Sequence, residues 1–304
     1  MTNIITITVD QKRLNEMKDY YSSYLLSNDS EYVYFFAKKD GLEITGYSSK
    51  KERKKVVFKG EEALKEAKIW DESAKEVEGK KKVEEDWMFF DDQIGSDEVG
   101  VGDFLLPMIV VAAFVSKNQI SLLKKYGVHD SKKLNDKKIM EIGPSLVKEF
   151  HFSKLTLPNE KYNEMVLKNE NLNSLKAKMH NRALLNMHKE FPDVINIFID
   201  EFVKPETYYK YLNDANEEQV RGIISRNKGE SYFPCVALAS VIARYSFLKE
   251  KEKLEEKYGM LFPCGASNKV NEFSKEFIKL HGLLEWNKIV KKNFANYNEV
   301  ISSI

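Results

Sequence analysis

The chain has 304 residues, of which 42% are hydrophobic and 12% aromatic, so it can bury the cores of two ordinary domains and is not globally disordered. Its 48 basic and 47 acidic side chains leave a net charge of only +1. The total charge therefore does not by itself indicate a nucleic-acid partner, which would have to appear in the distribution of the charges.

The two cysteines, Cys235 and Cys264, have no metal-type spacing and are expected to be reduced thiols. No apolar run approaches the roughly 18 residues of a membrane span, and the N-terminal residues alternate too regularly for a secretory signal. These features predict a cytoplasmic protein without a membrane partner.

The first 80 residues predict a small α+β domain. Alternation with a period of two marks its strands, and a period of 3.6 marks its helices. The expected elements are a strand at 4–9, a helix at 10–26, strands at 31–37, 42–47 and 54–58, and a helix at 61–77. Charged residues then dominate from 76 to 86, which predicts a linker over 81–90.

Residues 91–304 predict a larger α/β domain in which strands alternate with helices. Strands are expected at 91–96, 104–115, 151–157 and 194–200. Helices are expected at about 119–125, 136–150, 160–168, 172–191, 205–212, 232–257, 271–281 and 285–294. This alternation favours a mixed sheet covered by helices.

The segment Gln-Ile-Gly-Ser-Asp-Glu-Val-Gly-Val-Gly at 93–102 is the strongest functional signal. Asp97 and Glu98 lie among three glycines, directly before an apolar run. Paired carboxylates beside a glycine-rich backbone suit Mg²⁺ and a phosphate-bearing substrate. The glycine spacing does not match a P-loop or a dinucleotide fingerprint. A tight hairpin turn with solvated acids is the alternative interpretation.

A third acid, Asp200, ends the apolar strand expected at 194–200. Ligands gather at the carboxyl ends of strands in open α/β sheets, so Asp97, Glu98 and Asp200 are expected to converge. Neighbouring residues of a strand point to opposite faces, and Glu98 can join Asp97 only where the strand has ended or bulged. A turn or cap role for Asp200 is the alternative.

Two basic segments are candidates for contacts with a nucleic-acid backbone. Ser131, Lys132 and Lys133 precede an expected helix and could hold a phosphate at its N-terminus, although ordinary capping with solvated lysines explains them equally. Residues 50–59 carry lysines and an arginine close to the aromatic residues of the first domain, a combination that suits nucleic acid. The histidines lack a zinc-type spacing, and Cys235 is expected to be a buried structural thiol.

These motifs together resemble the type 2 ribonucleases H, and most closely bacterial ribonuclease HIII. The resemblance is carried by Gly-Ser-Asp-Glu-Val-Gly-Val-Gly-Asp at 95–103, Asp-Ser-Lys-Lys-Leu at 130–134, the strand closing on Asp200, and Val-Ala-Leu-Ala-Ser-Val-Ile-Ala-Arg-Tyr at 236–245. It covers essentially the whole chain. It implies an RNase H-like mixed sheet preceded by an N-terminal domain similar to the TATA-binding protein.

The resemblance also implies an endonuclease that cuts the RNA strand of RNA/DNA hybrids and leaves 5′-phosphate and 3′-hydroxyl ends. Asp97, Glu98 and Asp200 would bind two Mg²⁺ or Mn²⁺ ions roughly 4 Å apart. The backbone of Gly100, Val101 and Gly102 would read ribose 2′-hydroxyls. A fourth acid is expected, but Lys204 occupies the position four residues after Asp200, so Glu206 or Glu201 is predicted to substitute.

Two other functions remain open on the sequence. Without a secure fourth acid, the chain could bind hybrids without cutting them. It could instead excise single embedded ribonucleotides, as ribonuclease HII does, although Val101 stands where that group has an arginine. An RNA/DNA hybrid is the expected partner in each case, and a monomer is expected.

Overall fold

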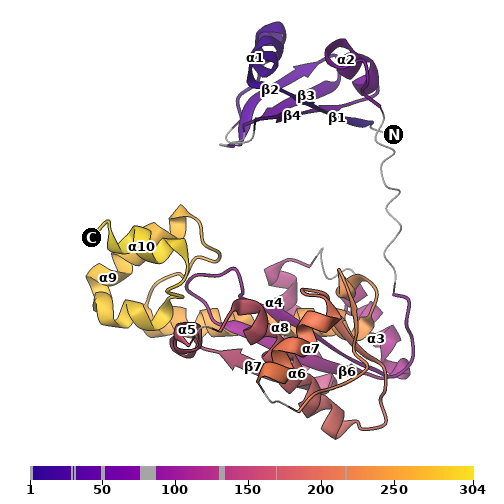
Figure 1. The fold of residues 1–304 in the computed structure, drawn as a ribbon, viewed down its shortest axis with the longest axis vertical. Coiled ribbons are helices and arrows are strands. Elements are labelled where there is room, and N and C mark those ends of the chain that lie inside the picture. The colour runs from indigo at the N-terminus through magenta and orange to yellow at the C-terminus, as the bar shows by residue number, and fades with distance from the viewer. Residues whose placement is uncertain are drawn as a thin grey trace. The chain divides into compact units, whose positions relative to one another are not determined.

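The computed structural model describes residues 3–28, 30, 32–48, 52–75, 87–129, 134–168, 170–215 and 218–304. The chain forms two compact units, 1–84 and 85–304, each of which is considered by itself (Figure 1). Of the linker predicted at 81–90, residues 81–86 lie outside the described part.

The first unit is a four-stranded antiparallel sheet with helices on one side (Figure 1). Its strands follow the order β1 (Ile4–Val9), β4 (Lys54–Lys59), β3 (Leu42–Tyr47) and β2 (Val33–Lys39). Alternate residues such as Ile5, Ile44 and Phe58 pack beneath helices α1 (Gln11–Tyr20) and α2 (Ala63–Trp70), with the short 3-10 helix η1 (Ser22–Tyr24) after α1. The other side of the sheet is left uncovered by these helices.

Helix α1 begins where predicted but is shorter than the predicted 10–26. Asp10 caps it by accepting a hydrogen bond from the backbone N–H of Arg13 at 2.8 Å. The α-helix ends at Tyr20, and the chain continues through the fully buried Tyr21 into the 3-10 helix η1. Helix α2 likewise ends at Trp70, before the predicted end at residue 77, which lies outside the described residues.

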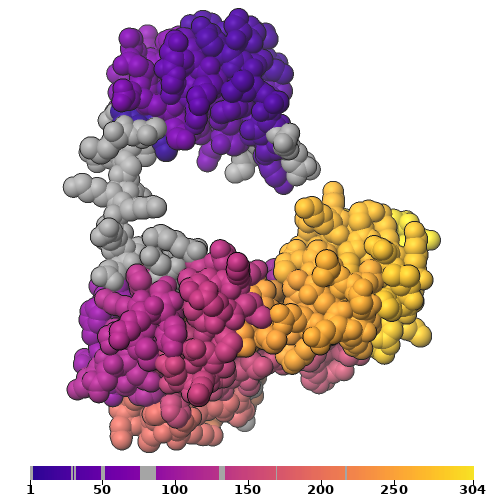
Figure 2. Space-filling model, turned by 180° about the vertical axis from the view of Figure 1, so that it is seen from behind, coloured from indigo at the N-terminus to yellow at the C-terminus, as the bar shows by residue number. Residues whose placement is uncertain are grey.

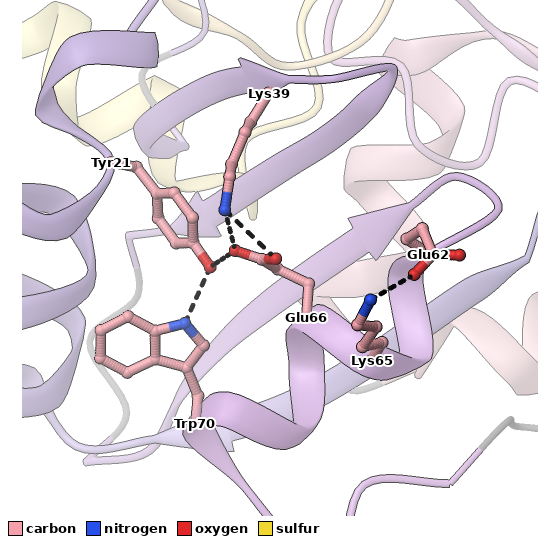
Figure 3. Close-up of polar contacts among 6 residues, drawn as sticks. All are labelled: Tyr21, Lys39, Glu62, Lys65, Glu66 and Trp70. Carbon is pink, nitrogen blue, oxygen red and sulfur yellow. Dashed lines mark hydrogen bonds and ion pairs between the residues drawn. The ribbon is translucent and has the colours of Figure 1, made fainter.

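A partly buried polar network joins the two helices of this unit to its sheet (Figure 3). The Trp70 indole N–H donates to the Tyr21 hydroxyl at 2.8 Å, and that hydroxyl donates to Glu66 at 3.0 Å. Lys39 on β2 completes the network with an ion pair to Glu66 at 3.1 Å. Burial raises the pKa of Tyr21, so the phenol keeps its proton and acts as a donor.

The second unit is built on a five-stranded mixed sheet with the order β7-β6-β5-β8-β9. Strands β5 (Gln93–Val99), β6 (Met108–Val115) and β7 (Phe152–Leu157) are antiparallel neighbours. Strands β8 (Ile197–Asp200) and β9 (Ile224–Arg226) extend the sheet from β5 in parallel. The predicted mixed sheet flanked by helices is therefore confirmed.

Helices cover both faces of this sheet. One face packs against α3 (Ile120–Lys125), α4 (Asp136–Glu149) and the long α8 (Pro234–Tyr258); the other packs against α6 (Leu172–Glu190) and α7 (Pro205–Asp214). The C-terminal helices α9 (Asn268–Ile289) and α10 (Ala295–Ile301) form a lobe at one side of the unit, coloured yellow in Figure 1 and Figure 2. Helix α5 (Asn159–Leu167) packs against α9, and two further 3-10 helices are η2 (Lys117–Gln119) and η4 (Gly229–Ser231).

Several predicted boundaries in this unit were wrong. Strand β5 runs through Asp97 and Glu98 to Val99, so the predicted Asp-Glu turn lies within a strand and the chain turns only after Gly100. The predicted strand at 104–115 starts at Met108. The three residues of β9 were not predicted, and the predicted helix at 285–294 ends at Ile289. None of the helices in the described part of the chain combines the length and hydropathy needed to span a bilayer.

We predict that Tyr21→Phe destabilises the first unit by about 1–3 kcal/mol, because it leaves the Trp70 N–H and the Glu66 carboxylate with one partner fewer in a buried site. Hydrogen exchange of the α1 and α2 amides in the full chain measures this local effect. Tyr24→Phe is the matched control because Tyr24 is 40% exposed. Equal exchange rates in both variants would show that the network contributes nothing.

Candidate active site

Strand β5 places its two acids on opposite faces of the sheet. A methyl group added to Gly95 would lie 2.4 Å from the sulfur of Cys235 on α8, so this residue and Asp97, two positions later, face α8. Ser96 instead hydrogen-bonds His180 on α6 at 2.8 Å, so it shares the α6 face with Glu98. The two neighbouring carboxylates therefore have different surroundings.

Asp97 and Asp200 share the α8 face, on adjacent strands. The parallel register aligns Gly95 with Phe198 and Ser96 with Ile199, so the next residue on each strand is one of these acids. The Asp200 carboxylate accepts a hydrogen bond from the backbone N–H of Gly229 at 2.8 Å. The Gly229 backbone packs closely here, since an added methyl group would lie 3.2 Å from the Asp200 Cα. The pairing of β5 with β8 thus brings together two acids that are far apart in the sequence.

The pKa values of both carboxyl groups are raised, which favours their protonated forms. Burial raises the pKa of Asp97 well above its usual range, and the negative charges of Glu98 and Asp200 raise it further. Hydrogen bonds from the Ser240 side chain and the Glu98 backbone N–H oppose this rise only in part. Burial also raises the pKa of Asp200. The raised pKa of Asp97 reflects burial and repulsion from the neighbouring carboxylates, and a bound cation would relieve that repulsion.

Two neighbouring side chains of the protein balance the negative charge of Glu98. Its carboxylate forms an ion pair with Lys176 and accepts a hydrogen bond from His180 Nε2 at 3.0 Å. Burial would raise the pKa of Glu98, but the His180 hydrogen bond and the Lys176 charge lower it to about 2. The phenyl ring of Phe202 covers this pair, with the Lys176 Nζ 4.0 Å from the ring centroid. Glu98 therefore carries a fully ionised carboxylate in a basic pocket.

Sequence reasoning missed Lys176 and His180. They lie four residues apart on α6, so both point from the same side of the helix toward the sheet. That spacing was the available signal, but it becomes informative only when α6 is known to cover the Glu98 face. Ser240 on α8 and Gly229 before it were also missed, because their roles depend on backbone and side-chain contacts made by the folded chain.

The predicted substitutes for a fourth acid lie just after β8. Glu201 forms an ion pair with Lys204 at 2.9 Å, and Glu206 is exposed in the first turn of α7. Glu230, which the sequence analysis did not consider, lies close enough for its charge to raise the pKa of Asp200. In the described residues, no three acidic, histidine or cysteine side chains are gathered closely enough to hold one metal ion together.

Contacts within the folded chain require glycine at position 100 but not at position 102, the two glycines that follow β5. Gly100 has a φ of +82°, and an added methyl group would lie 2.1 Å from the Pro107 carbonyl oxygen, so the fold itself demands glycine. No atom lies within 4 Å of the same position on Gly102. Val101 packs with a small cluster around Tyr162. The other predicted substrate contacts, Ser131, Lys132 and Lys133, lie outside the described residues.

Comparison with known proteins identifies the family of the chain. The family model of ribonuclease HII matches residues 94–297, and a model of a domain of unknown function matches 4–83. The ribonucleases HIII of Bacillus mycoides (strain KBAB4) and Bacillus cereus (strain AH187) are 38% and 37% identical to the chain, in each case over 97% of both sequences.

Solved structures extend the similarity to the fold. A structure of Bst-RNase HIII in complex with Mn²⁺ is 31% identical and superposes with a TM-score of 0.68, covering 99% of this chain and 98% of that one. Aquifex aeolicus RNase H3, at 19% identity and a TM-score of 0.53 over 95% of this chain and 99% of that one, shares the fold. The chain therefore belongs to the ribonuclease HIII family and is an endoribonuclease of the ribonuclease H type.

Proposed function

We propose that the chain hydrolyses the RNA strand of RNA/DNA hybrids at the site formed by Asp97 and Asp200, with Mg²⁺ or Mn²⁺ as its cofactor. The observation that carries the proposal is the pairing of β5 with β8, which places these two carboxylates on one face of the sheet, beside the Gly100–Gly102 turn. Cleavage on this scheme leaves 5′-phosphate and 3′-hydroxyl ends.

The donor set suits such an ion. Mg²⁺ and Mn²⁺ prefer oxygen ligands, and Mg²⁺ commonly uses one or two carboxylates together with waters and substrate phosphates. Asp97 and Asp200 supply two carboxylates whose mutual repulsion a divalent cation would relieve. A divalent ion held by these carboxylates would supply activation of water and stabilisation of the departing oxygen. Glu98 is proposed to complete the acid set from the other face of β5, and Glu206 remains the predicted fourth acid.

The chain's own residues have positioning roles in this scheme. Cys235 is fully buried and its pKa is raised by burial, so it is no nucleophile. His180 is also fully buried, between Ser96 and Glu98, and cannot reach a substrate as a general base. Asp97 and Asp200 are left to bind and orient, while Lys176 and His180 keep Glu98 ionised.

The Gly100–Gly102 turn is proposed to recognise ribose. Gly102 has open space where a side chain would stand, so no contact within the folded chain requires glycine there. Close approach of a ribose would require it, and the 2′-hydroxyl is the group that distinguishes RNA from DNA. Val101 packs against protein rather than offering a charged side chain, which favours substrates with several ribonucleotides over the excision of a single one.

The first unit is proposed to be a substrate-binding domain, residues 1–80. The side of its sheet opposite the helices, here called the open face, consists of Ile4, Thr6, Thr8, Phe36, Lys38, Glu43, Thr45, Tyr47, Lys55, Val57 and Lys59. Of the aromatic residues near the basic segment, Phe35 is buried in the core and Tyr34 hydrogen-bonds Asn15 on α1. Phe36 and Tyr47 are therefore the ones that reach the open face, while Lys50 and Lys51 lie outside the described residues.

Asp97→Asn is expected to lower hybrid cleavage about a thousandfold or more, because it removes a ligand from the proposed metal site, while binding of the hybrid persists. Cleavage of a labelled four-ribonucleotide duplex, with and without chelator, together with a binding assay, checks this. Asp91→Asn, an exposed acid just before the same strand, is the control. Full activity of the Asp97 variant would refute the site, and a wild-type chain without metal-dependent product would leave only a hybrid-binding protein.

Mn²⁺ binding is expected to release protons. The raised pKa of Asp97 keeps part of this group protonated above the usual range of an aspartate, so a cation must displace that proton and binds less tightly as the pH falls through that range. Glu98, with a pKa of about 2, is already ionised and releases none. Calorimetry in two buffers of different ionisation enthalpy counts the protons. An Asp97→Asn variant that released as many as the wild type would assign them elsewhere.

Phe36→Ala and Tyr47→Ala on the open face are each expected to weaken hybrid binding by about 1–3 kcal/mol, the range for loss of a base-stacking contact. The measurement is the affinity of the full chain for an uncleaved hybrid at several salt concentrations. Ile69→Ala removes an exposed apolar side chain of α2, away from the open face, and is the control. If all three variants bind alike, the open face does not hold the substrate.

A further inference from the structure

Lys291 is a fully buried lysine in the short segment between α9 and α10. Its ammonium group lies at the base of the turn that follows β5, in a unit whose other lysines mostly lie at the surface. Within the described part of the chain, no carboxylate lies within ion-pairing distance of it. A buried cation without a carboxylate partner is costly, so its environment must supply other compensation.

The hydrogen bonds that compensate the Lys291 ammonium group come from the backbone of one loop. The Lys291 Nζ donates to the carbonyl oxygens of Gly100 at 2.6 Å, Asp103 at 2.6 Å and Leu106 at 2.7 Å. An ammonium group has three donors, and each has one acceptor here. The backbone N–H of Lys291 adds a fourth contact, to the Phe104 carbonyl at 3.0 Å. Through these four hydrogen bonds, Lys291 fixes the backbone of residues 100–106.

The segment that carries Lys291 is itself fixed. On α5, the buried Asn159 and Asn163 side chains donate to the Ile289 and Val290 carbonyls at 2.7 and 2.8 Å. Asn163 also accepts from the backbone N–H of Lys292 at 2.9 Å. The backbone on both sides of Lys291 is therefore anchored to α5, which fixes the position of the lysine.

The loop that Lys291 holds contains the glycines next to the candidate acids. A second set of contacts fixes its far end: Asp103 accepts from the Gly265 N–H at 2.5 Å, and the Phe104 N–H donates to the Gly265 carbonyl at 3.0 Å. The Gly100 carbonyl points down to Lys291, while the site of a side chain on Gly102 stays open. Burial lowers the pKa of Lys291 to about 7, and the charge of Asp103 opposes this fall.

We propose that Lys291 is a positioning residue that fixes the backbone of the Gly100–Gly102 turn in the conformation that reads the ribose 2′-hydroxyl. The inference rests on the proposed function of that turn. Lys291 acts through three carbonyl groups and touches no reacting atom. Its removal should therefore cost discrimination between ribose and its 2′-modified analogues, beyond any general loss of rate.

The test compares two four-ribonucleotide duplexes, one all-ribose and one with a 2′-fluorine at the sugar before the cleaved phosphate. Lys291→Met keeps the length of the side chain and removes its donors. It should slow cleavage of the all-ribose duplex roughly tenfold to hundredfold, as for the loss of hydrogen bonds to a charged group, and slow the 2′-fluoro duplex much less. The ratio of the two rates should fall accordingly.

Two further variants keep the result interpretable. Lys292→Met changes the neighbouring exposed lysine and should leave the ratio as in the wild type. Asn163→Ala loosens the support but retains Lys291, so it should lower the ratio by a smaller factor if Lys291→Met fails to fold. Equal losses on both duplexes would overturn the positioning role. A wild-type chain that cuts with metal but does not discriminate would overturn both this role and the reading of the 2′-hydroxyl, and a chain that does not cut at all would overturn the proposed function itself.

Discussion

The parallel pairing of β5 with β8 is the constraint on which the rest of the second unit depends. It sets Asp97 beside Asp200, and without a cation two carboxylates in a desolvated site repel each other. The repulsion is tolerated because the strands themselves are secured on both faces, by α8 on one side and α6 on the other. Packing energy from two apolar layers thus maintains an arrangement that electrostatics alone would disperse.

The same sheet explains why Glu98 is treated differently. A strand presents neighbouring residues to opposite faces, so extending β5 through Asp97 and Glu98 sends the second acid into a separate environment. There, Lys176 and His180 each contact one carboxylate oxygen of Glu98. The pKa of Asp97 is therefore raised, whereas Lys176 and His180 lower the pKa of the adjacent Glu98. The two faces therefore differ: Asp97 and Asp200 lie together on the α8 face at the proposed metal site, while Glu98 is held ionised on the α6 face.

Much of this could be predicted from the sequence, and the failures have identifiable causes. Strong periodicity and a terminal acid located β8 and Asp200, since a strand that ends on a polar residue is a local signal. Glycines around Asp97 and Glu98 suggested a turn, because local propensity cannot reveal that β6 and β8 pair with this strand on both sides. Lys176 and Lys291 were invisible as site residues, because a lysine's partners lie far away in the sequence and only tertiary structure identifies them.

Lys291 shows how the backbone of a loop can be fixed without the hydrogen bonds of a strand. Residues 100–106 lack the ladder hydrogen bonds that fix β5, and glycine makes this turn flexible in the unfolded chain. Three carbonyls accept hydrogen bonds from one ammonium group in place of the missing ladder. Two asparagines on α5 in turn fix the backbone just before Lys291, by donating to the Ile289 and Val290 carbonyls. Because these contacts use backbone carbonyls, they leave the space at the side-chain position of Gly102 open. A support that approached with side chains from the open side would have blocked the ribose that the turn is proposed to read.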